Sequence, residues 1–466
     1  MRIADLWRWE GKVGRETYAL VGLIGFAIKN NLDRYVAVGF RRPWPLWSYW
    51  APLAPTMRIT SLTRADAVFV GTMLALSLPF IWLGVTMTVK RLRDAGQPVW
   101  LVGLFFVPVV NLLLFALLSV MPARVDEGKA EAAPWPGPRA LDRVIPRSGV
   151  GSAALAIVVT MVIGLSLALL GTVVVKGYGW GLFVALPFCL GLFSVLLYGY
   201  HQPRGFASCM GVAVLSVGLL GLTLLTFAVE GLICLIMAAP IALCLVLMGG
   251  ALGYAVQRRH WSRQAAPAML SVVLLFVPAF FGIERAANLE PPTLEVRSAI
   301  EVNAPPEIVW KQVVAFSEIP PPKELLFRAG IAYPIRAEMI GRGVGAERHC
   351  IFSTGAFVEP IEVWDAPRLL KFGVTANPAP MQEWTPYAHI QPPHLHGFLV
   401  SRAGQFQLTP LPGGRTRLEG TTWYRHTMWP AAYWQVWSDG IIHRIHLRVL
   451  EHIRTLAEKD AVANAT

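Results

Sequence analysis

The sequence predicts a polytopic α-helical membrane domain of about eight spans, followed by a soluble α+β domain. Of the 466 residues, 55% are hydrophobic and only 15% are charged, whereas an ordinary soluble domain is about 25% charged. Several apolar stretches reach the roughly 18 to 20 residues that a helix needs to cross a bilayer. After Ile283 the sequence changes to prolines, acidic residues and apolar residues at every second position, which is typical of strands.

Eight apolar segments are the candidate spans. They are residues 17–38, 66–88, 98–120, 150–175, 180–200, 206–229, 231–256 and 266–283. The first is the least regular, because Lys29, Asp33 and Arg34 interrupt it. Residues 123–149 are rich in proline and mixed in charge, a composition that cannot bury a core, so we expect a linker there. This linker separates residues 1–122, with spans one to three, from residues 150–285, with spans four to eight.

The charge is divided unevenly along the chain. Residues 1–285 contain 24 Lys and Arg against 12 Asp and Glu, whereas residues 286–466 contain 17 of each kind. Basic loops beside apolar spans usually meet anionic lipid headgroups. Nucleic-acid binding would instead need a basic face on the soluble part. The lipid bilayer is therefore the expected partner, nucleic acid is not, and no protein partner can be named.

A basic segment separates the second and third predicted spans. The sequence VKRLRDAGQPVW carries Lys90, Arg91, Arg93 and Asp94, and it predicts a tight basic loop at the membrane interface. Arg91 and Asp94 are three residues apart, so they can form an ion pair across one helical turn. A topological anchor and a lipid-headgroup or substrate site are both compatible with this pattern.

Two motifs give the N-terminal part a family resemblance. GKVGRETY at residues 11–18 and KRLRDAGQPVW at residues 90–100 resemble the paired motifs of the DUF805 family of small bacterial inner-membrane proteins. The matching residues are Gly11, Arg15, Tyr18, Arg91, Leu92, Asp94, Gly96 and Trp100. Arg93 and Ala19 depart from the family pattern, where His and Trp are usual. The resemblance covers about residues 1–122 and implies no chemistry, because the family has no established activity.

The C-terminal part predicts an ordered series of elements. LEVRSAIEV reads as a strand, and Ala304-Pro305-Pro306 opens a short helix. Three further strands follow within GRGVGAERHCIFSTGAFVEPIEVWDAPRLLKFGV, and a hairpin turns at Pro412-Gly413-Gly414. Apolar residues at helical spacing then predict a long helix over residues 430–458.

This order of elements resembles the SRPBCC domains, which are also described as START-like, polyketide cyclase/dehydrase-like or Bet v1-like. Three segments carry the same resemblance: IEVNAPPEIVWKQV, EPIEVWDAPRLLKF and PGGRTRLEGTTWY. The resemblance covers about residues 290–460. It implies a helix-grip fold, in which a sheet wraps around the long helix and encloses an apolar cavity. Many members bind lipids or other hydrophobic molecules and a few are enzymes, so the fold alone does not decide the function.

Inward strand positions and the sheet-facing side of the long helix are the expected cavity lining. The candidates are Phe352, Phe357, Trp364, Phe372, Phe398, Phe406, Trp423, Trp437, Ile441 and Ile445. The alternative is that these side chains simply fill a solid core, as aromatic residues usually do.

Catalytic and metal-binding signatures are weak. His394 and His396 alternate along the chain, and His443 and His446 are one helical turn apart, but neither pair matches a known metal spacing. Glu359, Glu362 and Asp365 could supply a general base only if one of them faces the cavity. We therefore predict no catalytic residue, no metal site and no cofactor.

Three functions are compatible with the sequence. The first is a membrane protein whose SRPBCC-like domain binds a lipid or other hydrophobic small molecule beside the bilayer. The second is a cyclase- or dehydratase-type enzyme that uses the same cavity, and the third is a structural or regulatory module without ligand. The low count of catalytic signatures favours a non-enzyme.

The expected location is the bacterial inner membrane. The basic segment at residues 90–93 favours a cytoplasmic face, and eight crossings would return the C-terminal domain to the cytoplasm. The same arrangement puts Arg258, Arg259 and Arg263 outside, against the positive-inside rule, so the number of crossings and the side of the domain remain separate questions.

Overall fold

A computed structural model describes residues 6–49, 63–107, 109–123, 139–258, 266–287, 290–385, 387, 390 and 392–464. The chain forms two compact units. The first comprises residues 1–227 and 238–289, and the second comprises residues 228–237 and 290–466. The short segment 228–237, which includes the start of a helix, thus packs with the C-terminal unit.

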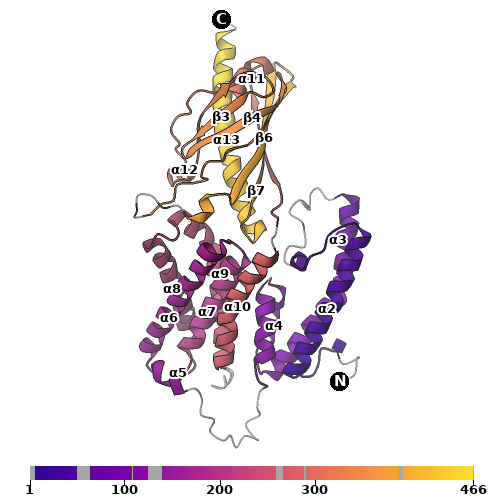
Figure 1. The fold of residues 1–466 in the computed structure, drawn as a ribbon, viewed down its shortest axis with the longest axis vertical. Coiled ribbons are helices and arrows are strands. Elements are labelled where there is room, and N and C mark those ends of the chain that lie inside the picture. The colour runs from indigo at the N-terminus through magenta and orange to yellow at the C-terminus, as the bar shows by residue number, and fades with distance from the viewer. Residues whose placement is uncertain are drawn as a thin grey trace, which may run out of the picture. The chain divides into compact units, whose positions relative to one another are not determined.

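The first unit is helical. Its elements are α2 (Arg15–Gly39), η1 (Leu46–Tyr49), α3 (Arg64–Asp94), η3 (Val99–Phe106), α4 (Val110–Val120), α5 (Arg139–Val144), α6 (Gly149–Leu169), η4 (Leu170–Val175), η5 (Gly181–Ala185), α7 (Leu186–Tyr198), α8 (Phe206–Thr226), α9 (Leu232–Arg258, from residue 238 onward in this unit) and α10 (Ala266–Ala287). Figure 1 shows these helices in indigo to red.

Six helices within the described ranges are long and apolar enough to cross a membrane. They lie at Arg64–Asp94, Gly149–Val175, Gly181–Tyr198, Phe206–Thr226, Leu232–Arg258 and Leu270–Ala287. Six of the eight predicted spans are thereby confirmed, and the chain is a multi-pass membrane protein. Residues 124–138, the larger part of the expected linker at 123–149, lie outside the described residues.

The predicted spans at residues 17–38 and 98–120 are not among these six helices. The first becomes α2, which buries Lys29 and Asp33 as an ion pair within its apolar stretch. The second divides into the 3-10 helix η3 and the short helix α4, and neither is long enough to cross the roughly 30 Å hydrocarbon core.

The basic segment at residues 90–94 was predicted to be a loop. It instead forms the last turns of α3. The guanidinium of Arg91 is fully buried and pairs with Asp94, as its spacing predicted. Its Nε donates to the Leu118 carbonyl at 2.8 Å, and Nη2 donates to the Met121 carbonyl. These carbonyls lie at the C-terminal end of α4, where backbone acceptors have no partner within the helix. Arg91 therefore caps a neighbouring helix, which accounts for its position better than a lipid phosphate does.

Helix α7 is deeply buried, because 94% of the residues in the span Gly181–Tyr198, which joins η5 and α7, are buried. Two glycines permit the close packing. A Cβ at Gly191 would lie 2.2 Å from the Val246 carbonyl oxygen, and one at Gly249 would lie 2.1 Å from that of Phe188. Both distances are shorter than any tolerated contact, so glycine is required where α7 and α9 cross.

The second unit contains a seven-stranded antiparallel sheet in its described part. The strands are β1 (Leu294–Val302), β2 (Pro334–Ile340), β3 (Glu347–Phe352), β4 (Gly355–Asp365), β5 (Leu369–Gly373), β6 (Leu399–Leu411) and β7 (Arg415–His426), in the order β1-β7-β6-β5-β4-β3-β2. The helices are α11 (Pro306–Val314), α12 (Leu325–Arg328), the 3-10 turn η6 (Pro393–Leu395) and α13 (Ala431–Ala463). Figure 1 shows the sheet curling around the yellow helix α13.

The predicted helix-grip architecture is thereby confirmed. The strand LEVRSAIEV is β1, the three strands before residue 374 are β3 to β5, and the hairpin at Pro412-Gly413-Gly414 joins β6 to β7 with Leu411 paired to Arg415. The long helix extends five residues past its predicted end.

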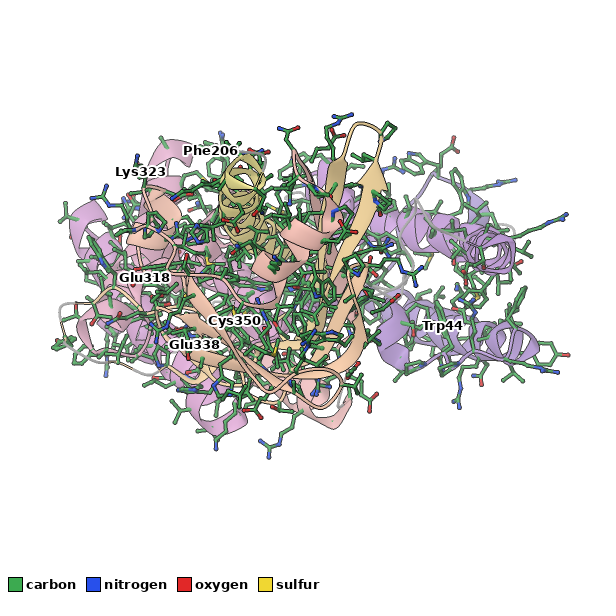
Figure 2. All side chains as sticks on the ribbon, turned by 90° about the horizontal axis from the view of Figure 1, so that it is seen from above. Trp44, Phe206, Glu318, Lys323, Glu338 and Cys350 are labelled. Carbon is green, nitrogen blue, oxygen red and sulfur yellow. The ribbon has the colours of Figure 1, made fainter. Side chains whose placement is uncertain are left out.

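The core of this unit lies where the sheet meets α13 and α11. Val449, Leu450 and Ile453 of α13 are almost fully buried, as is Leu418 of β7. These side chains occupy one side of the helix at steps of one, three and four residues, which is the stripe that a sheet-packed helix needs. Cys350 of β3 is buried, whereas Glu338 of β2 is exposed; Figure 2 labels both side chains.

Candidate functional site

A cavity lies between the curled sheet and α13. The volume open to the centres of water molecules is about 150 Å³, whereas one water needs about 10 to 15 Å³ by the same measure. The interior of the sheet is therefore not filled by the protein's own side chains. The surface that faces the cavity is mostly apolar, as in most sites for small molecules.

Six of the ten residues predicted to line a cavity do so. They are Phe352, Phe357, Phe372, Phe406, Ile441 and Ile445. The Phe352 and Phe357 rings pack edge to face with centroids 4.8 Å apart, across the β3–β4 hairpin. Ile441 and Ile445 are one turn apart on α13 and present the opposite, aliphatic wall.

The other four predicted residues do not line this cavity. Trp364 packs edge to face against Trp310 of α11 at 5.7 Å. The indole of Trp423 donates to Glu295 of β1 at 3.0 Å. Phe398 and Trp437 are both partly exposed. Alternation along β7 accounts for Trp423, because it lies on the strand face opposite to that of Thr422 and Tyr424, whose hydroxyl groups bond side chains of α13.

The cavity also has a charged element that the sequence analysis did not select. Arg348 of β3 and Glu359 of β4 face each other in the strand register and form an ion pair. Their side chains are only 2% and 8% exposed. Of the three carboxylates considered as a general base, Glu359 lines the cavity. Alternation along β3 contained the signal: Arg348 and Cys350 share the strand face of Phe352, which we had placed inward.

Three aromatic rings surround the guanidinium of Arg348. Its central carbon lies 5.6 Å from the Phe316 centroid, 5.5 Å from Phe372 and 5.4 Å from Phe406, all within the range of cation–π attraction. Burial alone would lower the pKa of Arg348, but the Glu359 carboxylate raises it overall. The guanidinium is therefore held in its charged form.

The hydrogen-bonding capacity of Arg348 is only partly used. Nη1 donates to Glu359, whereas Nε and Nη2 are buried and have no acceptor. These two nitrogens form the side edge of the guanidinium, which fits two oxygen lone pairs at once. Thr421 of β7, also in the lining, has a buried hydroxyl without a partner. Buried donors without acceptors are costly, and an acceptor oxygen placed in the cavity would relieve that cost.

A histidine cluster closes another part of the wall. His446 of α13 bonds the Thr422 hydroxyl through Nε2 at 2.7 Å and the Ser298 hydroxyl through Nδ1 at 3.1 Å. His443 bonds the same Ser298 at 2.7 Å, so the two histidines are neighbours, as their spacing predicted. Burial and the nearby His443 lower the pKa of His446 to about 4. The imidazole is therefore neutral at pH 7, with both nitrogens engaged.

Solved structures share only a low overall similarity with the chain. Norcoclaurine synthase from Thalictrum flavum is 12% identical over 37% of this chain and 99% of its own, with a TM-score of 0.25. The Zhui aromatase/cyclase from Streptomyces sp. R1128 is 13% identical over 36% of this chain and 95% of its own, with a TM-score of 0.24. A protein from Nitrosospira multiformis is 15% identical over 35% and 94%, with a TM-score of 0.22.

None of the curated proteins matches the chain. Residues 6–129 match the family described as "Protein of unknown function (DUF805)", and the resemblance seen in the paired motifs is thereby confirmed. The chain thus joins a DUF805 region, at its N-terminal end, to further membrane helices and a helix-grip domain.

Proposed function

We propose that the C-terminal unit binds an amphipathic lipid whose polar end carries a carbonyl or carboxyl group. The observation that supports this most directly is the Nε and Nη2 edge of Arg348, which is buried in an otherwise apolar cavity without an acceptor. Phenylalanine rings and isoleucine side chains suit the hydrocarbon part of such a ligand, and the guanidinium edge suits the two oxygens of an acid or ester.

The charge balance narrows the ligand class further. The Arg348 and Glu359 charges compensate each other, so a fully ionised phosphate would bring uncompensated negative charge into a buried site, which is costly. A neutral carbonyl, or a carboxyl group that shares its proton with Glu359, avoids this cost. Fatty acids and fatty acyl esters are therefore the favoured class, ahead of phospholipids with their phosphate inserted.

Binding is favoured over catalysis by how the polar groups are used. Glu359 is committed to Arg348, and both ring nitrogens of His446 are committed to hydroxyl groups. A general base must be free to reach the proton that it removes. The polar side chains of the lining thus resemble a fixed recognition site more than an acid–base pair.

The membrane part supplies a setting for such a ligand. Six apolar helices hold the chain in a bilayer, into which a fatty acyl compound partitions. We place the protein in a bacterial inner membrane with the basic end of α3, which carries Lys90, Arg91 and Arg93, on the cytoplasmic side. Five of the six long apolar helices follow this end, so the C-terminal unit then lies on the opposite side. A reporter fused to the C-terminus tests this side directly: activity of a periplasm-specific reporter supports it, and activity of a cytoplasm-specific reporter would contradict it.

The decisive experiment measures bound lipid on the full chain purified in detergent. Organic extraction and mass spectrometry identify any co-purified acyl lipid, and displacement of a fluorescent fatty acid measures affinity. Palmitic acid, methyl palmitate, hexadecanol and hexadecane are compared as competitors. We expect the acid and ester to compete best and the alkane to compete at least tenfold less well, since one lost hydrogen bond to a charged group is worth about 1.5 to 3 kcal/mol.

Arg348→Lys is the matched variant, because lysine can keep the ion pair with Glu359 but lacks the planar two-donor edge. Arg336→Lys, on the exposed side of β2, is the control. The proposal requires that Arg348→Lys lower the affinity for the acid and the ester but leave the affinity for the alkane unchanged. Equal affinity of all four competitors, or no bound or exchangeable lipid at all, would refute it.

A further inference from the structure

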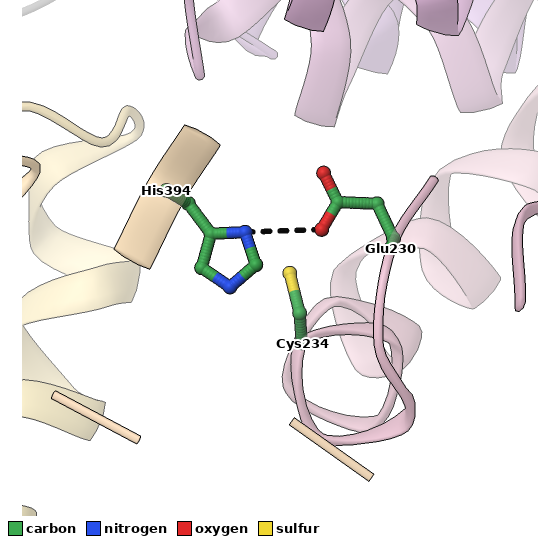
Figure 3. Close-up of side chains that lie close together, drawn as sticks. All are labelled: Glu230, Cys234 and His394. Carbon is green, nitrogen blue, oxygen red and sulfur yellow. Dashed lines mark ion pairs between the residues drawn. The ribbon is translucent and has the colours of Figure 1, made fainter. Parts of the chain in front are cut away.

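A second polar cluster lies in the C-terminal unit, away from the lipid cavity lining. Glu230 and Cys234 come from the segment 228–237, and His394 comes from η6. One ligand atom from each, a carboxylate oxygen, a sulfur and an imidazole nitrogen, lies within 4.8 Å of the others. Figure 3 shows the three side chains converging on one point. From this convergence we infer a zinc-binding site formed by Glu230, Cys234 and His394.

The donor set matches zinc chemistry. Zn²⁺ accepts thiolate, imidazole and carboxylate ligands at about 2.0 to 2.3 Å, in a tetrahedral arrangement. Magnesium and calcium prefer ligand sets made entirely of oxygen atoms. The mixed set of sulfur, nitrogen and oxygen therefore disfavours both ions. Nδ1 of His394 lies 3.0 Å from Oε2 of Glu230, which is close to the separation of two ligands on one metal ion.

A fourth residue, Glu383, supports the site by holding the His394 ring in place. Oε1 of Glu383 lies 3.2 Å from Nε2 of His394, the ring nitrogen that faces away from Glu230. Metal-bound histidines usually donate their second ring N–H to a carboxylate in this way, which fixes the tautomer and the ring orientation. The Glu383 side chain is completely buried, so this contact is not a surface coincidence.

Glu383 is itself positioned by the start of α9. The backbone N–H groups of Ile233 and Cys234 donate to its two oxygens at 3.1 and 3.2 Å, as expected for a carboxylate at a helix N-terminus. A Cβ at Gly231 would lie 2.1 Å from Oε2 of Glu383, so glycine is needed for this approach. The Trp384 carbonyl also accepts from the Leu232 N–H at 3.0 Å. The segment 383–384 is thus fixed against the same turn that carries Cys234.

A proton is the competing occupant. Burial alone would lower the pKa of His394, but Glu230 and Glu383 raise it to about 9, so a protonated imidazole between two carboxylates also satisfies their charges. That arrangement gives the Cys234 thiol no role, although its sulfur lies within 4.8 Å of Glu230 and His394. A zinc ion would use all three side chains and would link the start of α9 to the loop that contains His394.

The test is the metal content of the full chain, purified in detergent with a tag that contains no histidine. After equilibration with zinc and removal of excess ion, we expect about one zinc per chain by mass spectrometry. Cobalt(II) alone serves as a second probe, because a thiolate ligand gives a charge-transfer absorption in the near ultraviolet. That absorption reports Cys234 itself and does not depend on any activity.

Three variants make the test specific. Cys234→Ser and His394→Gln are expected to lose the zinc, and Cys234→Ser to lose the cobalt–thiolate absorption. Cys244→Ser, an exposed cysteine ten positions further along α9, is the control and should change neither readout. Glu383→Gln should retain the ion with an affinity about 10- to 100-fold lower.

The inference fails if the folded wild-type chain retains neither zinc nor cobalt, or if Cys234→Ser and His394→Gln bind zinc as well as the wild type does. Thermal unfolding of each metal-free variant distinguishes loss of the ligand from loss of the fold. A Cys234→Ser chain that unfolds like the metal-free wild type and yet binds no metal supports the site.

Discussion

Arg348 and Glu359 occupy directly opposite positions on β3 and β4 and form an ion pair inside the sheet. This ion pair is costly to bury, and its donors are only partly used. Charges in the interior cost free energy even when they compensate each other. Arg348 also keeps two buried donors without acceptors, and the proposed lipid recognition rests on this observation.

Removing one partner of this pair should be far more damaging than removing both. Arg348→Met leaves Glu359 buried without a counter-charge, and we expect a loss of about 3 to 5 kcal/mol in unfolding free energy. The double variant Arg348→Met/Glu359→Leu should recover most of that loss, since apolar side chains can replace a buried pair at little cost. Chemical unfolding of the full chain in detergent measures both. A double variant as unstable as the single one would contradict this account.

Partly filling the cavity should weaken lipid binding without weakening the fold. Ile445→Phe adds volume to a side chain that lines the cavity, and we expect at least about a tenfold loss of affinity, equivalent to about 1.4 kcal/mol. Displacement of a fluorescent fatty acid provides the measurement. Val436→Phe is the control, because Val436 lies on the same helix and is 74% exposed. Unchanged affinity in Ile445→Phe would place the ligand elsewhere.

Periodicity predicted the architecture well because burial determines it. Apolar runs of membrane length and strands of alternating polarity each follow from the environment of the whole element, and the six long helices and the order of strands were found in this way. The short helices η3 and α4 were missed, since a continuous apolar stretch does not reveal where the backbone changes from one helix to the next.

The site residues show where such reasoning ends. Phe352 and Phe357 were found by assigning inward strand positions to large apolar side chains. Arg348 shares the strand face of Phe352 and was passed over, because charged residues are almost never fully buried unless they are paired. Its partner Glu359 comes from the next strand, and only the register between β3 and β4 brings the two together.

The cluster around His394 was out of reach for another reason. Glu230 and His394 are 164 positions apart in the sequence (394 − 230), and no local motif connects them. We judged His394 and His396 together, as an alternating pair. The structure separates them, because His394 is buried while His396 is exposed. Clusters that depend on tertiary contacts between distant segments leave no periodic signal.

Close packing of α7 against α9 should make Gly191 intolerant of even one added methyl group. Gly191→Ala places a Cβ 2.2 Å from the Val246 carbonyl oxygen, and overpacking of this kind costs about 1 to 3 kcal/mol. Gly211→Ala on α8 is the matched control, because no atom lies within 4 Å of its added Cβ. There the change should be neutral or stabilising by up to about 1 kcal/mol, from helix propensity alone. Thermal unfolding in detergent compares them, and equal effects would show that the helices can separate without cost.

Acidification should destabilise the C-terminal unit through His446. The pKa of this imidazole is lowered to about 4 in the folded chain, chiefly by burial and further by His443, whereas an unfolded histidine titrates near 6.5. The unfolded chain therefore binds a proton first as the pH falls, so the stabilising contribution of the neutral ring is complete above about pH 6.5 and is lost progressively toward pH 4. His446→Gln keeps a hydrogen-bonding side chain but removes the titration. We expect the difference in unfolding temperature between wild type and His446→Gln to shrink or reverse between pH 7 and pH 4. A difference that stays constant over this range would show that His446 is not the group responsible.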